Sequence, residues 1–265
     1  MTLKICVAGV TGWTGEAVAR AVLAADDMSL VSGVSRSASG QDLGRLLTGE
    51  VNGVPVVGSV EEALDDAEVL IDYTAHEAVL DHTLSAIARG VSVVVGTSGL
   101  TAADYDGIDT AARERGVGVV AAGNFSLTAA LAQAAALLAA RHLPSWEIID
   151  YASETKPDAP SGTARELAER LGGVRRPEVP VPVWRTAGPV EARGAGVAGG
   201  QVHSVRLPGF TLSTEVVFGL PDERLIIRHD AGTSAAPYVA GTLVAARAAP
   251  SRVGLTRGLD QLLLD

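Results

Sequence analysis

The chain has 265 residues, 47% of them hydrophobic and 20% charged, a balance typical of a globular protein with one large or two modest domains. Its formal net charge of -10 argues against partners such as nucleic acid or an anionic membrane surface, because both require a basic face. The single cysteine, Cys6, excludes a disulfide framework and a multi-cysteine metal site, and we expect no bound metal. We find neither a signal peptide nor a run of about 20 apolar residues, so we expect a cytoplasmic protein.

The first half of the chain alternates short Val-rich runs with helical patterns. Strands are expected at residues 3–9, 28–35, 54–59, 68–74, 91–99 and 117–126. Helices are expected between them, at residues 15–25, 60–67, 77–90 and 102–116. This alternation predicts an α/β fold whose doubly wound parallel sheet, of the Rossmann type, is covered by helices on both faces.

The pattern changes after residue 126. A long Ala/Leu helix at 127–143, a strand at 145–153 and a helix at 162–171 precede a Pro-, Gly- and Arg-rich stretch at 172–200, which is predicted to be a loop or arm. Apolar and polar residues then alternate at 201–209, 212–220 and 223–231, as in antiparallel strands with one solvated or partner-covered face. The tail, at 234–249 and 257–264, is helical again.

This organisation predicts two domains. The first is a dinucleotide-binding domain of residues 1–126, on which C-terminal helices from residues 234–265 pack. The second is a substrate-binding and oligomerisation domain of residues 127–233, an α/β domain with an open mixed or antiparallel sheet.

A glycine-rich turn between the first strand and the first helix carries the first chemical signal. In "VAGVTGWTGEAVA" the glycines allow a tight turn and a close approach of the backbone to a pyrophosphate, which the following helix N-terminus favours. The spacing is G-x-x-G-x-x-G, so a glycine-rich turn without a ligand is the alternative. The predicted cofactor contacts here are Gly9, Thr11, Gly12, Trp13, Thr14 and Gly15.

The end of the second strand bears on the choice of dinucleotide. Enzymes that bind NAD usually place an acid here, but this chain has Ser35, Arg36 and Ser37 and no acid before Asp42. An arginine with neighbouring hydroxyls suits a 2′-phosphate, which an acid would repel. We therefore predict NADPH as the cofactor, with NADH possible. The alternative is that Arg36 is a solvated loop residue.

Two further strand ends carry candidate cofactor contacts, because ligands of open α/β sheets bind beyond the carboxyl ends of the strands. The stretches "GTSGL" and "AGNFS" place small polar residues and glycines there, although tight loops also need Gly and Asn. The candidates are Gly96, Thr97, Gly123, Asn124 and Phe125, and Thr74 in the stretch "IDYT" is a further candidate.

These segments together with "KPDAPSGTA" resemble the dihydrodipicolinate reductase family, and the similarity runs nearly from end to end. The resemblance implies reduction of a cyclic, carboxylated imine with NADPH or NADH. It also implies a homotetramer assembled through the sheet of the second domain. It further implies that the Lys156 side chain, the candidate catalytic residue, binds a substrate carboxylate with the turn Ser161-Gly162-Thr163. The alternative is that the Pro-rich turn only caps a helix and that the Lys156 side chain is solvated.

The same resemblance identifies further substrate contacts and one departure. Ser98 falls where the family has a carboxylate-binding threonine, and Ser153 falls at the second of two family histidines. Ala152 replaces the first histidine, the family's proposed general acid, and Thr155 is also not a histidine. The loss removes the obvious proton donor, whose usual contribution to the rate is about 10²–10⁴. His76 and His82, expected on the surface of a helix, offer no replacement.

The departure leaves several functions open. We favour an NADPH-dependent reductase of a cyclic C=N bond that has diverged in its substrate or proton donor. An authentic dihydrodipicolinate reductase of lysine and diaminopimelate biosynthesis is the first alternative. A non-catalytic NADP(H)-binding sensor is the second, although such a protein has no reason to keep Lys156 and the Ser-Gly-Thr turn.

Overall fold

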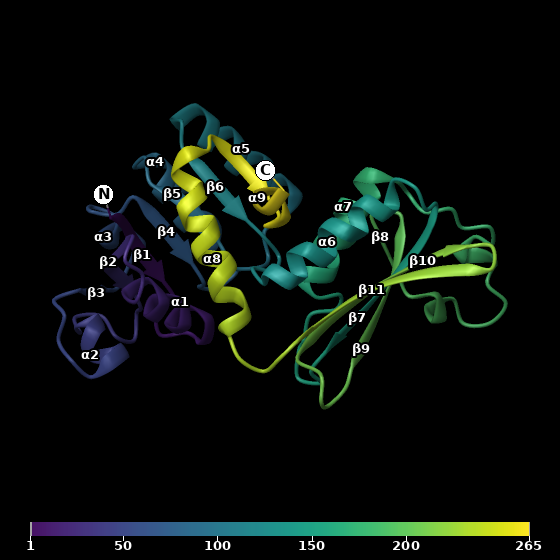
Figure 1. Ribbon diagram of the computed structural model, residues 1–265, viewed down its shortest axis with the longest axis horizontal. Coiled ribbons are helices and arrows are strands. Elements are labelled where there is room, and N and C mark those ends of the chain that lie inside the picture. The colour runs from purple at the N-terminus through teal and green to yellow at the C-terminus, as the bar shows by residue number, and fades with distance from the viewer. Residues whose placement is uncertain (1, 265) are drawn as a thin grey trace. The chain divides into compact units, whose positions relative to one another are not determined.

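The computed structural model describes residues 2–264, which divide into two compact units (Figure 1). The first unit comprises the residues up to Leu127 together with those from Ala235 onward, and the second comprises Thr128–Ser234. Each unit has its own sheet and its own core. Within residues 2–264, every helix is too short or too polar to cross a lipid bilayer.

The first unit is built on a seven-stranded sheet in the order β12-β6-β5-β4-β1-β2-β3, and all of its strand pairs are parallel. The strands are β1 (Leu3–Ala8), β2 (Met28–Val34), β3 (Val56–Val57), β4 (Val69–Asp72), β5 (Ser92–Val95), β6 (Gly118–Ala121) and β12 (Gly254–Arg257). Every residue of β4, β5 and β6 is buried, as expected for strands covered on both faces. The predicted doubly wound α/β sheet is therefore confirmed.

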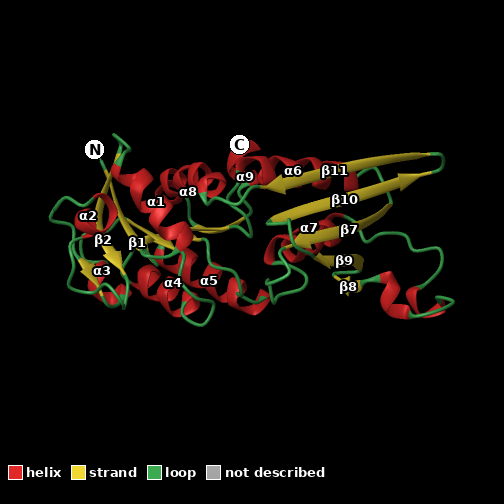
Figure 2. Ribbon diagram, turned by 90° about the horizontal axis from the view of Figure 1, so that it is seen from below, coloured by secondary structure: helices red, strands yellow, loops and turns green. Residues whose placement is uncertain are grey.

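Helices cover both faces of this sheet. They are α1 (Trp13–Leu23), α2 (Leu43–Thr48), α3 (Val60–Ala63), α4 (Val79–Ala88), α5 (Ala102–Arg115), α8 (Ala236–Ala248) and α9 (Asp260–Leu264), with a short 3₁₀ turn η3 (Ala249–Ser251). Figure 2 shows α1 and α8 on one side of the sheet and α4 and α5 on the other. The order of the strands reverses between β1 and β4, so the carboxyl ends of these strands flank the crevice where such sheets bind ligands.

The second unit is built on a five-stranded sheet in the order β11-β10-β7-β9-β8. Its strands are β7 (Ser145–Ala152), β8 (Ala195–Val197), β9 (Gly200–Arg206), β10 (Leu212–Leu220) and β11 (Glu223–Ala231). Strands β7 and β9 pair in parallel and the other pairs are antiparallel, so the sheet is mixed. Its helices are α6 (Leu127–Ala140) and α7 (Gly162–Val174), and the arm between α7 and β8 holds the 3₁₀ turns η1 (Val183–Arg185) and η2 (Val190–Arg193).

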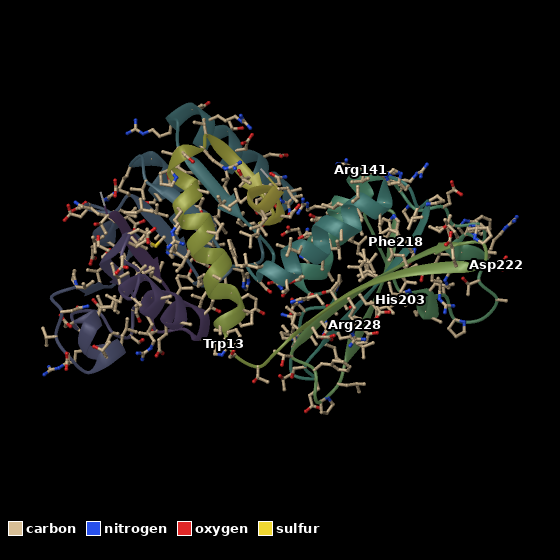
Figure 3. All side chains as sticks on the ribbon, in the orientation of Figure 1. Trp13, Arg141, His203, Phe218, Asp222 and Arg228 are labelled. Atoms are coloured by element: carbon tan, nitrogen blue, oxygen red, sulfur yellow. The ribbon has the colours of Figure 1, made fainter. Side chains whose placement is uncertain are left out.

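The core of this unit lies between one face of the sheet and its helices. Trp146, Ile148 and Phe218 are buried there with alanines and leucines of α6 and α7, and Figure 3 shows Phe218 on the helix side of the sheet. Alternation along the strands sends His203 and Arg228 to the opposite face. Among the described residues, helices thus cover one face of this sheet and leave the other open, which agrees with the alternating sequence pattern.

The structure also differs from the predicted elements. Strand β12 was not predicted, because Gly254–Arg257 is too short to show a pattern and is a strand only by pairing with β6. Helix α2 was also missed. Helix α1 begins at Trp13, so Gly15 lies in its first turn and does not precede it.

Candidate active site

The glycine turn after β1 is packed too closely for side chains. Gly9 has φ +79, and a Cβ atom there would lie 2.3 Å from the carbonyl oxygen of Tyr73. A Cβ atom on Gly15 would lie 2.1 Å from the carbonyl oxygen of Gly9. The N-cap residue of α1, Gly12, has no side chain that could accept the first N–H groups of the helix. The turn therefore suits an anionic group placed against the backbone.

The end of β2 brings together hydroxyls and one arginine. The Oγ atom of Ser35 lies 2.9 Å from Oγ1 of Thr11 and 3.2 Å from Oγ of Ser37. The side chain of Arg36 is exposed beside them and forms no ion pair within residues 2–264. Four predicted cofactor residues, Thr11, Ser35, Arg36 and Ser37, thus lie together at the glycine turn. A phosphate in addition to the pyrophosphate could pair there with the Arg36 guanidinium.

A pocket of about 400 Å³ opens at the carboxyl ends of β4 and β5. It brings together the predicted residues Trp13, Thr14, Thr74, Gly96, Thr97 and Ser98. Its other lining residues, Tyr73, Ala75 and His76, were not predicted to be site residues. Trp13 is 56% exposed, and its ring meets that of Tyr238 edge to face with centroids 5.9 Å apart, beside the start of α8 (Figure 3).

The polar wall of this pocket is organised by Asp72, the last residue of β4. Its carboxylate is fully buried, and Oδ1 accepts the Oγ1–H group of Thr74 at 2.7 Å and that of Thr97 at 2.8 Å. The same Oδ1 atom accepts the backbone N–H group of Thr74 at 2.9 Å. Oδ2 lies 2.8 Å from Nδ1 of His82. One buried carboxylate therefore sets the rotamers of two candidate cofactor residues.

His82 differs from its predicted place on the helix surface. Its side chain is only 20% exposed, because α4 turns it toward Asp72. The hydrogen bond to Asp72 raises the pKa of His82 above its ordinary value, although burial acts in the other direction. Burial by itself raises the pKa of Asp72, but the hydrogen bonds from His82, Thr74 and Thr97 outweigh it, and the pKa lies below its ordinary value. His76 is exposed as expected, but it precedes α4 and lines the pocket instead of lying on the helix.

The predicted cofactor residues after β6 lie in the loop from Gly123 to Phe125. The Phe125 side chain is 2% exposed and packs edge to face on Tyr73, so only its backbone remains for a ligand. Asn124 accepts the N–H group of Ser126 through Oδ1 at 2.8 Å. Its Nδ2 atom is buried without a hydrogen-bond partner among the described residues. The Asn124 amide therefore keeps an unsatisfied donor at this strand end.

In the second unit, the predicted substrate turn is anchored to Asp150 of β7. The N–H and Oγ–H groups of Ser161 donate to the two carboxylate oxygens of Asp150 at 2.8 and 2.7 Å. Ser161 is also the N-cap of α7, where its Oγ atom accepts the N–H group of Ala164 at 3.3 Å. Both donors of Ser161 are thus committed within the protein, and a substrate anion would meet the following residues, Gly162 and Thr163, at the helix N-terminus.

Arg206 completes this anchor. Its guanidinium donates to Oδ2 of Asp150 at 2.8 Å and to the carbonyl oxygen of Asp158 at 2.7 Å. The Ser204 hydroxyl adds a longer bond to the same carboxylate, at 3.2 Å. Asp150 is fully buried and Arg206 is 16% exposed, so breaking this pair would leave a buried charge. The turn is therefore held at both of its ends.

Lys156, the candidate catalytic residue, is one-third exposed and pairs with Asp158 at 2.8 Å. Burial raises the pKa of Asp158, but the hydrogen bond and the charge of Lys156 outweigh burial and lower it. The ammonium group therefore has a carboxylate partner already, and a substrate carboxylate would compete with it or join it.

The two positions at which the resemblance implies family histidines, 152 and 153, differ in their surroundings. Ala152 is fully buried at the end of β7. Ser153 is half-buried, and its hydroxyl lies 3.0 Å from that of Thr155. Neither side chain is an acid that titrates near neutral pH. Asp72, His82, Asp150, Asp158 and Arg206 were missed as site residues, although an aspartate at or near the end of a Val- or Ile-rich strand is a signal that could have found Asp72 and Asp150.

The fold and these two sites define an oxidoreductase with a dinucleotide-binding α/β unit and a second α/β unit. The chain belongs to the dihydrodipicolinate reductase family: the model of the family's N-terminal part matches residues 3–125, and that of its C-terminal part matches residues 123–263.

Relatives and solved structures agree with this assignment. The 4-hydroxy-tetrahydrodipicolinate reductase of Moorella thermoacetica is 38% identical, over 99% of this chain and 98% of its own. That of Synechococcus elongatus is 36% identical, over 98% of each chain. The dipicolinate-bound dihydrodipicolinate reductase of Paenisporosarcina sp. TG-14 has a TM-score of 0.78 and 27% identity, covering 98% of this chain and 99% of that one.

Proposed function

We propose that this protein is an authentic 4-hydroxy-tetrahydrodipicolinate reductase that uses NADPH. The anchored turn around Asp150 carries the proposal, because it holds Lys156 and the start of α7 ready for a carboxylated substrate. Relatives of nearly the same length bear this name, which supports the authentic reductase over the diverged imine reductase that the sequence favoured. Reduction of a C=N bond follows from that assignment.

The residues of the first unit fit a nicotinamide dinucleotide. The glycine turn leaves room only for a ligand against its backbone, and the lining of the pocket beyond β4 and β5 includes threonine and serine side chains beside aromatic ones. The exposed Arg36 with the Ser35 and Ser37 hydroxyls favours NADPH over NADH. When bound, such a cofactor supplies a hydride to the carbon of the C=N bond.

The residues of the second unit bind and orient the substrate in this proposal. Lys156 and the N–H groups at the start of α7 neutralise a carboxylate and fix its position. Ala152 cannot donate a proton, and Ser153 is a poor acid, so rate enhancement rests on orientation and electrostatics. A substrate that is already an iminium needs no further donor.

An assay of NADPH oxidation tests the proposal. Consumption with freshly generated dihydrodipicolinate precursor, and little with uncharged cyclic imines, is expected. Consumption only with simple cyclic imines would instead support the diverged reductase, which is favoured by the expected replacement of two family histidines by Ala152 and Ser153. Tight NADPH binding without turnover of either substrate would support the sensor.

A second copy of this chain is proposed to cover the open face of the second sheet. That face carries Ile149, Tyr151 and Val205 around an apolar depression, next to Ile226, which is 52% exposed. Exposed apolar groups on a sheet are typical of an interface. Light scattering should give the mass of a tetramer, and Ile226→Glu should reduce it, whereas a wild-type monomer would contradict the proposal.

A further inference from the structure

In the pocket at the ends of β4 and β5, Asp72 fixes which hydroxyl groups donate hydrogen bonds and which atoms are left to accept them. An ionised carboxylate has no hydrogen to give, so each group bonded to Asp72 must be the donor. The hydroxyl hydrogens of Thr74 and Thr97 therefore point at its Oδ1 atom, at oxygen–oxygen distances of 2.7 and 2.8 Å. What remains on each hydroxyl is an acceptor lone pair.

The strength of these hydrogen bonds fixes the orientation of both hydroxyl groups. Bonds to a charged acceptor are roughly twice as strong as bonds between neutral groups, so the hydroxyls are not free to turn round. His82 donates from Nδ1 to the other carboxylate oxygen, at 2.8 Å, and its protonated form provides the countercharge for this fully buried anion. The lowered pKa of Asp72 agrees with a carboxylate that stays ionised.

We propose that Asp72 makes Thr74 and Thr97 dedicated hydrogen-bond acceptors for the carboxamide NH₂ group of the nicotinamide. This inference rests on the proposed function and deepens it by assigning a specificity-determining role to a residue that need not touch the cofactor. Any ligand group that meets these two oxygens must bring the hydrogen with it. A ligand group that has only acceptor atoms would be repelled by the lone pairs of these two oxygens.

The strand order indicates which half of the dinucleotide reaches the Thr74 and Thr97 hydroxyls. The glycine turn follows β1, and Ser35 and Arg36 follow β2 on one side of it. Thr74 and Thr97 follow β4 and β5 on the other side. A dinucleotide whose pyrophosphate lies on the glycine turn and whose 2′-phosphate lies near Arg36 therefore directs its nicotinamide toward the threonines. The carboxamide NH₂ is the hydrogen-bond donor of that ring.

Calorimetric binding of cofactor analogues to the full-length protein tests the inference without turnover. The probes are NADP⁺, its thionicotinamide analogue, which keeps the NH₂ donor, and its 3-acetylpyridine analogue, which has a methyl group instead. Wild-type protein is expected to bind the first two similarly and the third at least about tenfold more weakly, the effect of leaving a polar group unpaired.

Variants separate the contact from a general loss of structure. Thr97→Val should weaken the binding of NADP⁺ to the level of the 3-acetylpyridine analogue, and it should leave the binding of that analogue unchanged. Thr97→Ser should restore the preference for NADP⁺ over the analogue. Thr74→Val tests the other oxygen in the same way. Thr110→Val, on the exposed face of α5, is the matched control and should change nothing. Asp72→Ala frees both hydroxyls to donate, so the ratio of the dissociation constants for the 3-acetylpyridine analogue and for NADP⁺ should fall close to one. If this variant does not fold, the Thr74 and Thr97 variants decide the question.

The outcomes are distinct from those of the proposed function. Equal binding of all three probes by wild-type protein would overturn the inference and leave the reductase assignment intact. An equal loss for every probe in both Val variants would assign the oxygens to ribose hydroxyls, which also overturns it. Failure to bind any dinucleotide would instead remove the proposed cofactor.

Discussion

The hydroxyl of Ser161 donates to Oδ1 of Asp150 at 2.7 Å, and through this bond the start of α7 is tied to the end of β7. The same serine caps the helix, so one side chain serves both strand and helix. The turn at Ser161, the proposed substrate turn, is therefore positioned by a buried carboxylate and not by its own residues alone. The first unit contains a comparable arrangement, since the buried Asp72 plays the corresponding part at the end of β4.

Removal of the Ser161 hydroxyl should affect both stability and substrate binding. Ser161→Ala is expected to cost about 1–3 kcal/mol in the free energy of unfolding, because a buried acceptor loses its donor and a helix loses its cap. The KM for the carboxylated substrate should rise with it. Thr101→Ala removes the exposed N-cap of α5 and is the control, with a loss of about 1 kcal/mol and an unchanged KM. Equal KM values in the two variants would contradict a role for the anchor.

Removal of the Lys156 ammonium group should weaken substrate binding selectively. Lys156→Ala is expected to raise the KM for the carboxylated substrate by about tenfold to a hundredfold, the worth of a hydrogen bond between charged groups. The dissociation constant of NADPH should stay constant. Lys4→Ala, which removes an exposed lysine beside Asp66, is the control. An unchanged KM would show that the lysine is not used.

Reversal of the charge at Arg36 should change the cofactor preference. Arg36→Asp is expected to lower the ratio of kcat/KM for NADPH to that for NADH by about tenfold or more, because the carboxylate repels a 2′-phosphate and accepts ribose hydroxyls. Arg115→Asp, at the end of α5, has the same formal charge change and should leave the ratio as it is. If both variants behave alike, the phosphate site lies elsewhere.

Histidines introduced at positions 152 and 153 test the departure from the family pattern that the resemblance implies. Ser153→His should be tolerated because Ser153 is half-buried, whereas Ala152→His adds bulk at a fully buried position and should cost about 1–3 kcal/mol. If the double variant folds, its activity on dihydrodipicolinate precursor should rise, by up to the about 10²–10⁴ that a positioned acid supplies. A folded double variant without any gain would mean that the site around β7 has been remodelled more deeply.

The pair of His82 and Asp72 should make stability depend on pH. The raised pKa of His82 means that its contribution is complete below the ordinary value of 6.5 and is lost as pH rises through the raised pKa. The lowered pKa of Asp72 means that its contribution is present above 3.8 and is lost as pH falls through the lowered pKa. Glu61 and Asp81, on α3 and α4, add to the field at His82. The Tm difference between wild type and His82→Gln should therefore be largest between about pH 4 and 6.5, and a difference independent of pH would contradict the pairing.

Much of the fold could be predicted because its signals are local. Val-rich runs separated by helical patterns predicted the parallel sheet, and alternation at 212–220 and 223–231 predicted the strands now seen as β10 and β11. The glycine turn was identified because its glycines recur at a fixed spacing between an expected strand and an expected helix. Each of these inferences needs only neighbours in the chain.

The contacts of buried charges could not be predicted in this way. His82 is expected on a helix surface from the sequence, yet the position of β4 beside α4 gives it a buried partner, Asp72. The sequence predicts Ser161 as a substrate contact but does not show that its N–H group donates to Asp150, nor that Arg206 binds the same carboxylate from a position 56 residues further along the chain. Periodicity tells which face of an element is buried but not which residue lies opposite.

The sequence by itself determined the family, the alternation of strands and helices, and the residue types that a dinucleotide and a carboxylate require. Only the tertiary structure decided which side chains are free to meet a ligand and which are committed within the protein. The physical reason is that a buried carboxylate must be satisfied by several donors at once, and donors such as Thr97 and Arg206 come within reach only when separate strands have paired.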